Sequence, residues 1–292
     1  MSRKVYIGIG LLLVVLLLSG VVFAGPPDHA GDNQGVGEPL TVLVVGYGWY
    51  RGIPEGQINN AQLVAEALDG EKIMVRDENG KPVAQANIHG MVVPVTWSGA
   101  MPPVYEAIEE LDPDIVLGVG TMGGGALRFE PGSNWARGTD ANPDDPEDEE
   151  YKDELIVPDG PDYYHSNMPY VEMILSVLET GTPAQLGFLR EWEDGPIPYR
   201  STAGGYLCNW MAYLLPHYVE VNDLDINVGF VHIPTQPAYR VEGRLAAAQA
   251  AETEEELEEI LKGNFGAFMD IDRTIEGVRT ALETNVRILS QE

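Results

Sequence analysis

The sequence contains few basic residues and a single cysteine, Cys208, and each scarcity excludes a class of protein. Its 292 residues include 17 Lys and Arg against 46 Asp and Glu, which gives a net charge of −29. A surface this acidic repels nucleic acid and anionic membrane surfaces, so neither is an expected partner. The acidity is typical of a highly soluble protein. One cysteine excludes an internal disulfide, so the thiol is either a buried apolar side chain or a reactive group.

The first 24 residues have the pattern of an export signal. Arg3 and Lys4 make a basic start, and residues 6–24 carry no charge and end in small side chains. The uncharged run is also just long enough to span a bilayer, so the segment is either a cleaved signal peptide or a retained anchor. Both interpretations predict an exported protein, secreted or anchored at the outer face of the cytoplasmic membrane, with no other membrane contact. Residues 25–39 are rich in Gly, Pro and Asp, which predicts a flexible linker.

The rest of the chain, residues 40–292, alternates β-branched runs with amphipathic stretches. Strands are predicted at 40–45, 91–95, 115–119 and 228–233, and helices at 60–68, 104–111, 170–178, 206–215, 243–262 and 270–289. This alternation predicts a single α/β domain with an open, twisted, mainly parallel sheet and helices on both faces. Sites in such sheets lie beyond the carboxyl ends of the strands, so the loops there are expected to share one cleft.

The sequence predicts no cofactor and no metal site. The loop at 120–125 is rich in glycine but lacks the Gly-Lys-Ser/Thr ending of a P-loop and the spacing of a dinucleotide fingerprint. It is expected to be a tight turn that a substrate can approach closely. The acidic loop at 140–162 lacks the glycine and the ordered spacing of an EF-hand, so a solvated surface loop is expected there.

Cys208 and His232 form the pattern of a nucleophile and its base. Cys208 follows the small residues 203–205 and begins a predicted helix, whose free N–H groups and dipole favour a thiolate and can stabilise an oxyanion. His232 ends an apolar strand. Taken singly, such a Cys is more often inert and such a His more often structural. Together they supply what nucleophilic catalysis requires.

These two segments resemble the pyroglutamyl peptidase I family, the pyrrolidone-carboxylate peptidases. The family pattern Ala-Gly-x-Tyr/Phe-Leu/Val-Cys-Asn matches residues 203–209, and Gly-Phe-Ile-His-Ile/Val-Pro matches residues 229–234 apart from Val231. The resemblance extends over residues 41–285. It implies an α/β cysteine peptidase that removes N-terminal pyroglutamate from peptides through a thioester, without a cofactor. It also implies that the chain can form homo-oligomers.

The resemblance further implies a third catalytic residue and a substrate pocket. After a one-residue gap the family's catalytic glutamate corresponds to Glu130, which would fix the tautomer of His232 and stabilise its charged form. The alternatives for Glu130 are a capping or surface role, with another carboxylate such as Asp140 beside the imidazole. The substrate-binding residues implied by the resemblance are Tyr47, Tyr50, Asn59 and Arg137.

The departures from the family concern the pocket. Tyr47 and Tyr50 hold the positions of two phenylalanines and add hydroxyl groups, which need water or a partner. Three interpretations follow: a pyroglutamyl hydrolase acting outside the cytoplasm, a related cysteine amidohydrolase with an altered pocket, or a non-catalytic binding protein with the same fold. Retention of the cysteine with the correctly spaced histidine argues against the third. Most relatives are cytosolic, so export is an unusual feature.

Overall fold

A computed structural model describes residues 36–50, 53, 56–136, 154–187, 190–192, 199–201, 203–262 and 268–291. The predicted export signal, most of the predicted linker, residues 140–153 of the acidic loop, and Arg137 lie outside the described residues. Within the described ranges, no helix has both the length and the apolar character that crossing a membrane requires.

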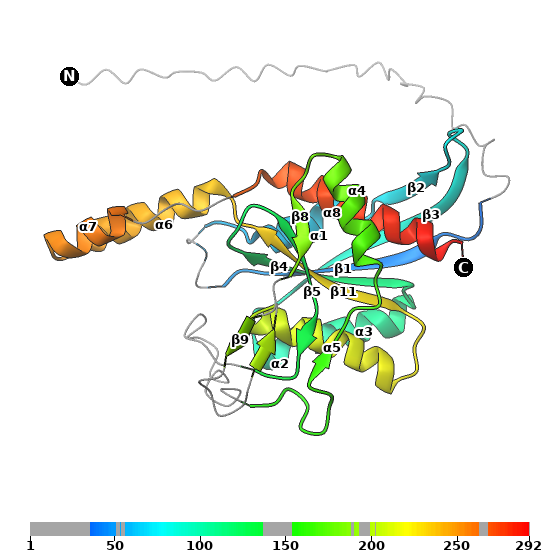
Figure 1. Cartoon of the computed structure of the whole chain (residues 1–292), viewed down its shortest axis with the longest axis horizontal. Helices are drawn as coiled ribbons and strands as arrows, with labels where there is room; N and C mark the ends of the chain where they lie inside the picture. The colour runs from blue at the N-terminus through cyan, green and yellow to red at the C-terminus, as the bar shows by residue number, and fades with distance from the viewer. Residues whose placement is uncertain are drawn as a thin grey trace, which may run out of the picture. The chain divides into compact units, whose positions relative to one another are not determined.

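The core is a seven-stranded sheet. Its strands are β1 (Leu40–Tyr47), β2 (Lys72–Arg76), β3 (Pro82–Val93), β4 (Ile115–Met122), β5 (Leu127–Glu130), β8 (Ala184–Leu186) and β11 (Asn227–Pro234). Their order is β2-β3-β1-β4-β11-β5-β8 (Figure 1). The four central strands are parallel to one another, and β8 is parallel to β5. Only β2 and β5 pair antiparallel with the central strands, so the predicted mainly parallel sheet is confirmed.

Eight helices are described: α1 (Asn60–Leu68), α2 (Trp97–Ala100), α3 (Pro102–Leu111), α4 (Tyr170–Glu179), α5 (Leu207–Val221), α6 (Pro237–Ala250), α7 (Glu254–Lys262) and α8 (Ile271–Leu289). Figure 1 shows α1, α4 and α8 on one face of the sheet and α2, α3 and α5 on the other. Two small sheets pair β6 (Gly132–Ser133) with β7 (Tyr163–Tyr164) and β9 (Arg190–Trp192) with β10 (Tyr199–Ser201).

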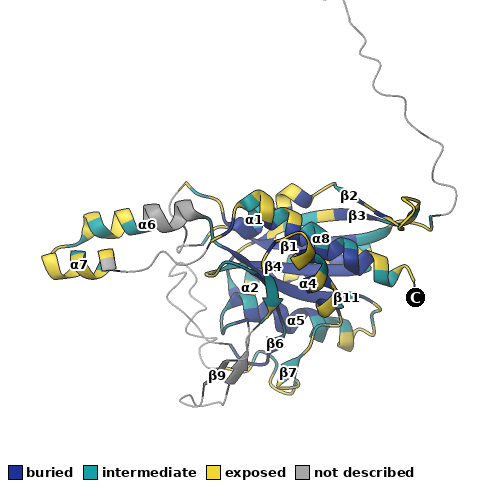
Figure 2. Cartoon of the chain, turned by 45° about the horizontal axis from the view of Figure 1, so that its top comes forward, coloured by how far each residue is buried: buried dark blue, intermediate teal, exposed yellow. Residues whose placement is uncertain are grey.

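Three of the central strands, β1, β4 and β11, are continuous apolar runs because helices cover both faces of the sheet there, whereas β3 alternates buried and more exposed residues. Residues 42–47 of β1 and 227–234 of β11 are almost all buried. Figure 2 shows these strands as a dark layer, while the outward faces of the surrounding helices are exposed. The carboxyl ends of β1, β4 and β11 therefore open together at one edge of a well-packed core.

The prediction of one helix at 243–262 is wrong, because the chain forms α6 and α7 there with a break at residues 251–253. A capping box begins the second helix. The Thr253 hydroxyl accepts a hydrogen bond from the Glu256 N–H at 3.1 Å, and the Glu256 carboxylate accepts from the Thr253 N–H at 3.2 Å. This local capping ends the helical pattern that the apolar spacing suggested.

Candidate active site

Cys208 is the second residue of α5, so its predicted place at a helix start is confirmed. Its sulfur lies against the end of β4, since a Cβ built on Gly120 would stand 2.7 Å from Cys208 Sγ. Aromatic contacts hold the turn before the helix: the Trp97 ring meets those of Tyr206 and Trp210 edge to face, each with centroids 5.2 Å apart. The absence of a side chain at Gly120 therefore makes room for the thiol.

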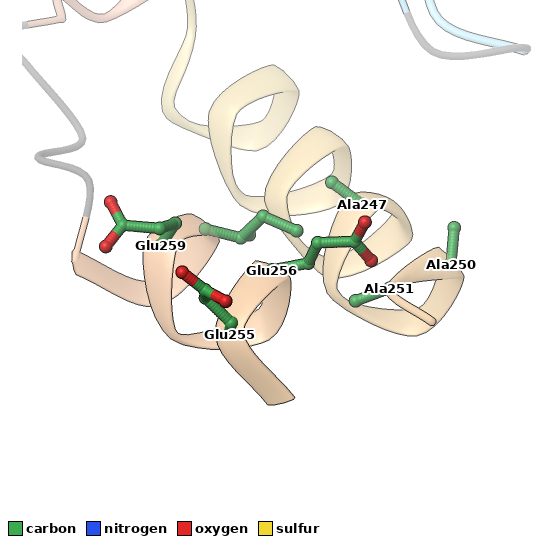
Figure 3. Close-up of a pocket in the computed structure, with 7 residues that line it drawn as sticks. Ala247, Ala250, Ala251, Glu255, Glu256 and Glu259 are labelled. Carbon is green, nitrogen blue, oxygen red and sulfur yellow. The ribbon is translucent and has the colours of Figure 1, made fainter. Parts of the chain in front are cut away.

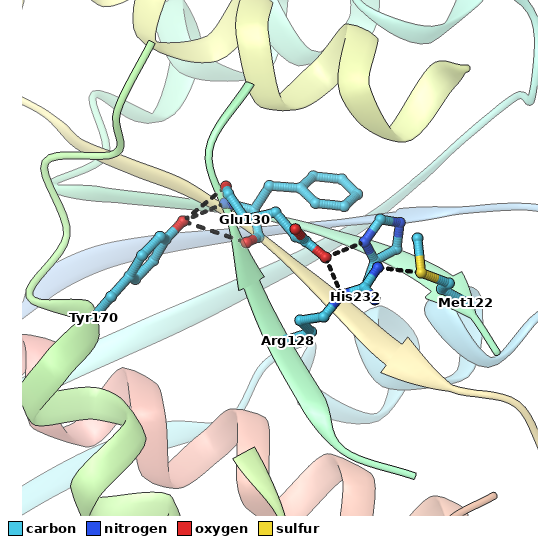
Figure 4. Close-up of polar contacts among 6 residues, drawn as sticks. Met122, Arg128, Glu130, Tyr170 and His232 are labelled. Atoms are coloured by element: carbon cyan, nitrogen blue, oxygen red, sulfur yellow. Dashed lines mark hydrogen bonds and ion pairs between the residues drawn. The ribbon is translucent and has the colours of Figure 1, made fainter. Parts of the chain in front are cut away.

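His232 lies beside Glu130 in the interior. His232 Nδ1 is 2.9 Å from Glu130 Oε1, and the two residues are 2% and 1% exposed (Figure 4). We assign the ring proton to Nδ1, because a carboxylate can only accept. Nε2 is then unprotonated and able to take a proton. Of the two carboxylates considered from the sequence, Glu130 occupies this place and Asp140 lies outside the described residues.

Strand register brings the thiol and the imidazole together. His232 on β11 pairs with Gly120 on β4, the residue against which the Cys208 sulfur lies. Directly paired residues present their side chains on the same face of a sheet. The thiol and the imidazole therefore lie on the same face of the sheet, at the carboxyl ends of two parallel strands, where sites in α/β sheets form.

The environment of the pair leaves both groups uncharged at neutral pH. The pKa of the Cys208 thiol is raised to about 12, chiefly by burial and next by the Glu130 carboxylate, while Arg128 acts in the opposite direction. These effects outweigh the helix start, which alone predicts a thiolate. Burial lowers the pKa of His232, and its hydrogen bond with Glu130 offsets this only in part. The resting pair is therefore a thiol and a neutral imidazole, so the thiol needs a base when it reacts.

Arg128 is a member of this cluster that the sequence did not indicate. Its guanidinium donates to the same oxygen of Glu130 that bonds His232, and it also reaches the Met122 sulfur (Figure 4). Only 11% of its side chain is exposed. Arg128 stands two residues before Glu130 on β5, which puts both side chains on one face of the strand. That spacing would have indicated Arg128 had β5 been predicted.

Tyr170 also escaped the sequence analysis. Its hydroxyl accepts a hydrogen bond from the Phe230 N–H at 2.8 Å and lies 3.5 Å from the Glu130 carbonyl oxygen. It therefore bridges β5 and β11, the two strands that carry Glu130 and His232 (Figure 4).

Asn209, directly after the nucleophile candidate, anchors α5 to the segment that follows Glu130. Its Oδ1 accepts from the Ser133 N–H at 2.9 Å, and its Nδ2 donates to the carbonyl of Trp135 at 2.8 Å. The side chain is fully buried. These bonds fix the helix that carries Cys208 relative to the strand that carries Glu130.

Tyr47 is buried, and its hydroxyl donates to the carbonyl oxygen of Leu207, the residue before Cys208. The hydroxyl that distinguishes it from the family's phenylalanine therefore has a partner. Burial raises the pKa of Tyr47 well above its usual value, and the neighbouring Cys208 adds to this, so the phenol stays protonated. Tyr47 thus ties the end of β1 to the first turn of α5.

The other substrate-binding residues implied by the resemblance are Asn59, Tyr50 and Arg137, and the hydrogen bonds of Asn59 join two loops. Asn59 caps α1 through the Ala61 N–H, accepts from the Thr121 hydroxyl at 2.6 Å and donates to the Gly48 carbonyl at 2.8 Å. Both polar groups of its amide are therefore occupied in joining the loops after β1 and β4. Tyr50 is half-buried at the edge of the core. Arg137 lies outside the described residues.

Removing the Tyr47 hydroxyl tests its hydrogen bond to the Leu207 carbonyl, which joins β1 to α5. We expect Tyr47→Phe to lower the free energy of unfolding by about 0.5–1.5 kcal/mol, the usual contribution of one buried hydrogen bond. Urea denaturation measures this. Tyr218→Phe is the matched control, because the Tyr218 hydroxyl bonds Glu109 on the exposed surface. Equal stability of the two variants would contradict a structural role for the Tyr47 hydroxyl.

A side chain at position 120 should disturb the site directly. The Cβ of Gly120→Ala would stand 2.7 Å from both the Cys208 sulfur and the Phe230 ring. We expect overpacking to lower the free energy of unfolding by about 1–3 kcal/mol. We also expect the variant to lose most of its catalytic activity. Gly37→Ala is the control, since no atom lies within 4 Å of the Cβ added there. Unchanged kcat in Gly120→Ala would contradict the placement of the thiol against β4.

A hollow lies between α6 and α7, apart from the cluster around His232 (Figure 3). It is lined by Ala247, Ala250, Ala251, Glu255, Glu256, Glu259 and Ile260. These side chains include no thiol, imidazole or cation. The hollow therefore does not offer the groups of a nucleophilic active site, and the cluster around His232 remains the candidate.

Comparison with known proteins finds related chains that match most of this sequence. Residues 40–287 match the family model described as pyroglutamyl peptidase. The pyrrolidone-carboxylate peptidase of Pyrococcus furiosus is 28% identical over 245 residues, which cover 84% of this chain and 97% of that protein. The one from Brevibacillus brevis is 32% identical over 172 residues, covering 59% and 70%. The structure of a mutant pyrrolidone carboxyl peptidase from P. furiosus is similar with a TM-score of 0.65 at 26% identity, covering 86% of this chain and 100% of that one.

Proposed function

Because this chain belongs to the pyroglutamyl peptidase family of cysteine peptidases, we propose that it removes N-terminal pyroglutamate from peptides with Cys208 as nucleophile and His232 as base. Glu130 orients the imidazole and stabilises its charged form. The observation that carries the proposal is the buried 2.9 Å hydrogen bond between His232 and Glu130. His232 pairs with Gly120, and the Cys208 sulfur lies against Gly120.

The reaction follows from the positions of the three groups. His232 Nε2 takes the thiol proton while Cys208 Sγ bonds the pyroglutamyl carbonyl carbon, and the positive end of the α5 dipole stabilises the oxyanion. The carbon–nitrogen bond then breaks, His232 gives its proton to the leaving amine, and a thioester remains. Water, deprotonated by His232, attacks the thioester. Pyroglutamate leaves and the thiol recovers its proton.

Substrate preference tests the proposal. A pyroglutamyl residue is an uncharged lactam, whereas a prolyl residue carries a charged amine that is costly to desolvate and lacks the ring carbonyl. We expect the protein to hydrolyse fluorogenic pyroglutamyl amides and to discriminate strongly against prolyl and alanyl amides. Preference for another amide would favour the related amidohydrolase with an altered pocket. Inertness towards all three would favour a binding protein.

The pH profile of kcat/KM should report the buried histidine. The reaction needs His232 neutral, and burial lowers its pKa from 6.5. We therefore expect full activity above an acid limb whose midpoint lies below 6.5, with activity falling as the pH falls through that midpoint. Initial rates at low substrate concentration measure it. A midpoint above 6.5 would contradict the buried, neutral base.

We also propose that the protein is exported, because a basic start precedes an uncharged run of signal length at residues 6–24. Its substrates would then be peptides outside the cytoplasm. Fractionation of cells that express the full chain or the chain without residues 1–24 tests this. We expect activity outside the cytoplasm only for the full chain, and equal distribution of the two forms would overturn the proposal.

A further inference from the structure

A row of paired residues crosses the sheet from β4 through β11 and β5 to the edge strand β8, and it includes His232. His232 pairs with Arg128 on β5, and Arg128 pairs with Gln185 on the edge strand β8. Paired residues share a face. The order across this face is therefore Cys208 against Gly120, then His232, then Arg128, then Gln185.

A cavity of about 140 Å³ adjoins His232, and Cys208 does not line it. Its walls are His232, Arg128, Gln185, Ile233 and the glycine-rich turn at residues 122–126. Tyr47, Tyr50 and Asn59, the implied pyroglutamyl-binding residues, do not line it. The cavity therefore adjoins the imidazole but is distinct from the residues implied to bind the acyl group.

We infer that this cavity receives the amino acid that follows the scissile bond, an inference that rests on the proposed function. During breakdown His232 protonates the leaving nitrogen, which must therefore lie within hydrogen-bond reach of the imidazole. The acyl carbon is at that moment bonded to Cys208. The leaving residue must then extend away from the thiol. Beyond His232, the next side chains on this face of the sheet are those of Arg128 and then Gln185.

The volume and the lining of the cavity determine which side chains of the leaving residue it can accept. A cavity of about 150 Å³ holds one benzene ring, so 140 Å³ suits a side chain no larger than a single ring. The polar side chains that line it are a guanidinium, a carboxamide and the imidazole, and no carboxylate lines it. No atom lies within 4 Å of a Cβ built on Gly124, so the turn leaves its backbone open. The cavity therefore favours acidic and amide side chains over basic ones and excludes tryptophan.

The test is a series of pyroglutamyl dipeptide amides with Asp, Asn, Lys or Trp as the second residue. For the wild type we expect kcat/KM to be higher with Asp and Asn than with Lys and Trp. Gln185→Glu places a carboxylate on the wall and should lower the rate with Asp and raise it with Lys, each by about threefold, as for a partly exposed ion pair. Gln185→Lys should act in the opposite direction.

The control substrate is pyroglutamyl amide, whose leaving group is ammonia and has no side chain to enter the cavity. The rate of each Gln185 variant with this substrate is used to normalise its rates with the four dipeptides, so that the Asp-to-Lys ratio of kcat/KM reports the cavity alone. If the wild type had the same kcat/KM for all four dipeptides, and the two variants did not change this, the leaving-group site would be overturned. The proposed function would still stand. Failure of the wild type to hydrolyse pyroglutamyl amide and all four dipeptides would overturn both. The comparison of Asn with Trp in the wild type is independent of how well the variants fold.

Discussion

Replacing Cys208 with alanine should lower kcat by a factor of about 10⁴ or more, because no thioester can then form. Cys208→Ser keeps a nucleophilic atom of smaller size and should be nearly as inactive. Both substitutions are small and stand in the first turn of α5, so the fold should persist. Circular dichroism and urea unfolding check the fold, and hydrolysis of a pyroglutamyl amide measures the activity.

The single cysteine makes this prediction easy to control. Alkylation by iodoacetamide can modify only Cys208, and the fraction alkylated should equal the fraction of activity lost. Because burial raises the pKa of this thiol to about 12, the alkylation rate should keep rising with pH instead of levelling off near neutrality. Full activity in Cys208→Ser, or in completely alkylated protein, would contradict the assignment of the nucleophile.

How much of this site the sequence reveals depends on how local each signal is. Cys208 and His232 each lie in a short contiguous motif, and the structure places them on neighbouring elements. Glu130 required an alignment gap, and the four-residue strand that carries it has no clear alternation that would have located it independently. The i, i+2 spacing of Arg128 from Glu130 is informative only once β5 is known, and the place of Gln185 beside the cluster depends on the register of β5 with β8.

The same distinction applies to the electrostatics. The helix start at Cys208 is a local feature, and by itself it predicts a thiolate. Burial and the nearby Glu130 are long-range effects that the sequence does not contain, and they act in the opposite direction. Likewise, the continuous apolar runs predicted β1, β4 and β11, whereas only the end of β3 was predicted and β2, β5 and β8 were missed.

Glu130→Gln should lower kcat by a factor of about 10³–10⁴, comparable to the loss of the carboxylate in other triads. Arg128 and His232 both donate to Oε1 of Glu130, so a glutamine would keep its oxygen there and hold the tautomer. Its NH₂ would take the place of Oε2, which is buried without a hydrogen-bond partner. The imidazolium formed during the reaction would then lack a counter-charge and face the positive Arg128.

The same substitution should also cost stability, which has to be separated from catalysis. Removing one member of a buried ion pair typically costs about 3–5 kcal/mol, because the other charge remains uncompensated. The double variant Glu130→Gln, Arg128→Met removes that charge and should recover much of the stability without recovering kcat. Loss of the carboxylate also removes an effect that raises the pKa of His232, so any residual activity should have its acid limb at lower pH. If kcat returned together with stability in the double variant, Glu130 would act through folding alone and the triad would reduce to Cys208 and His232.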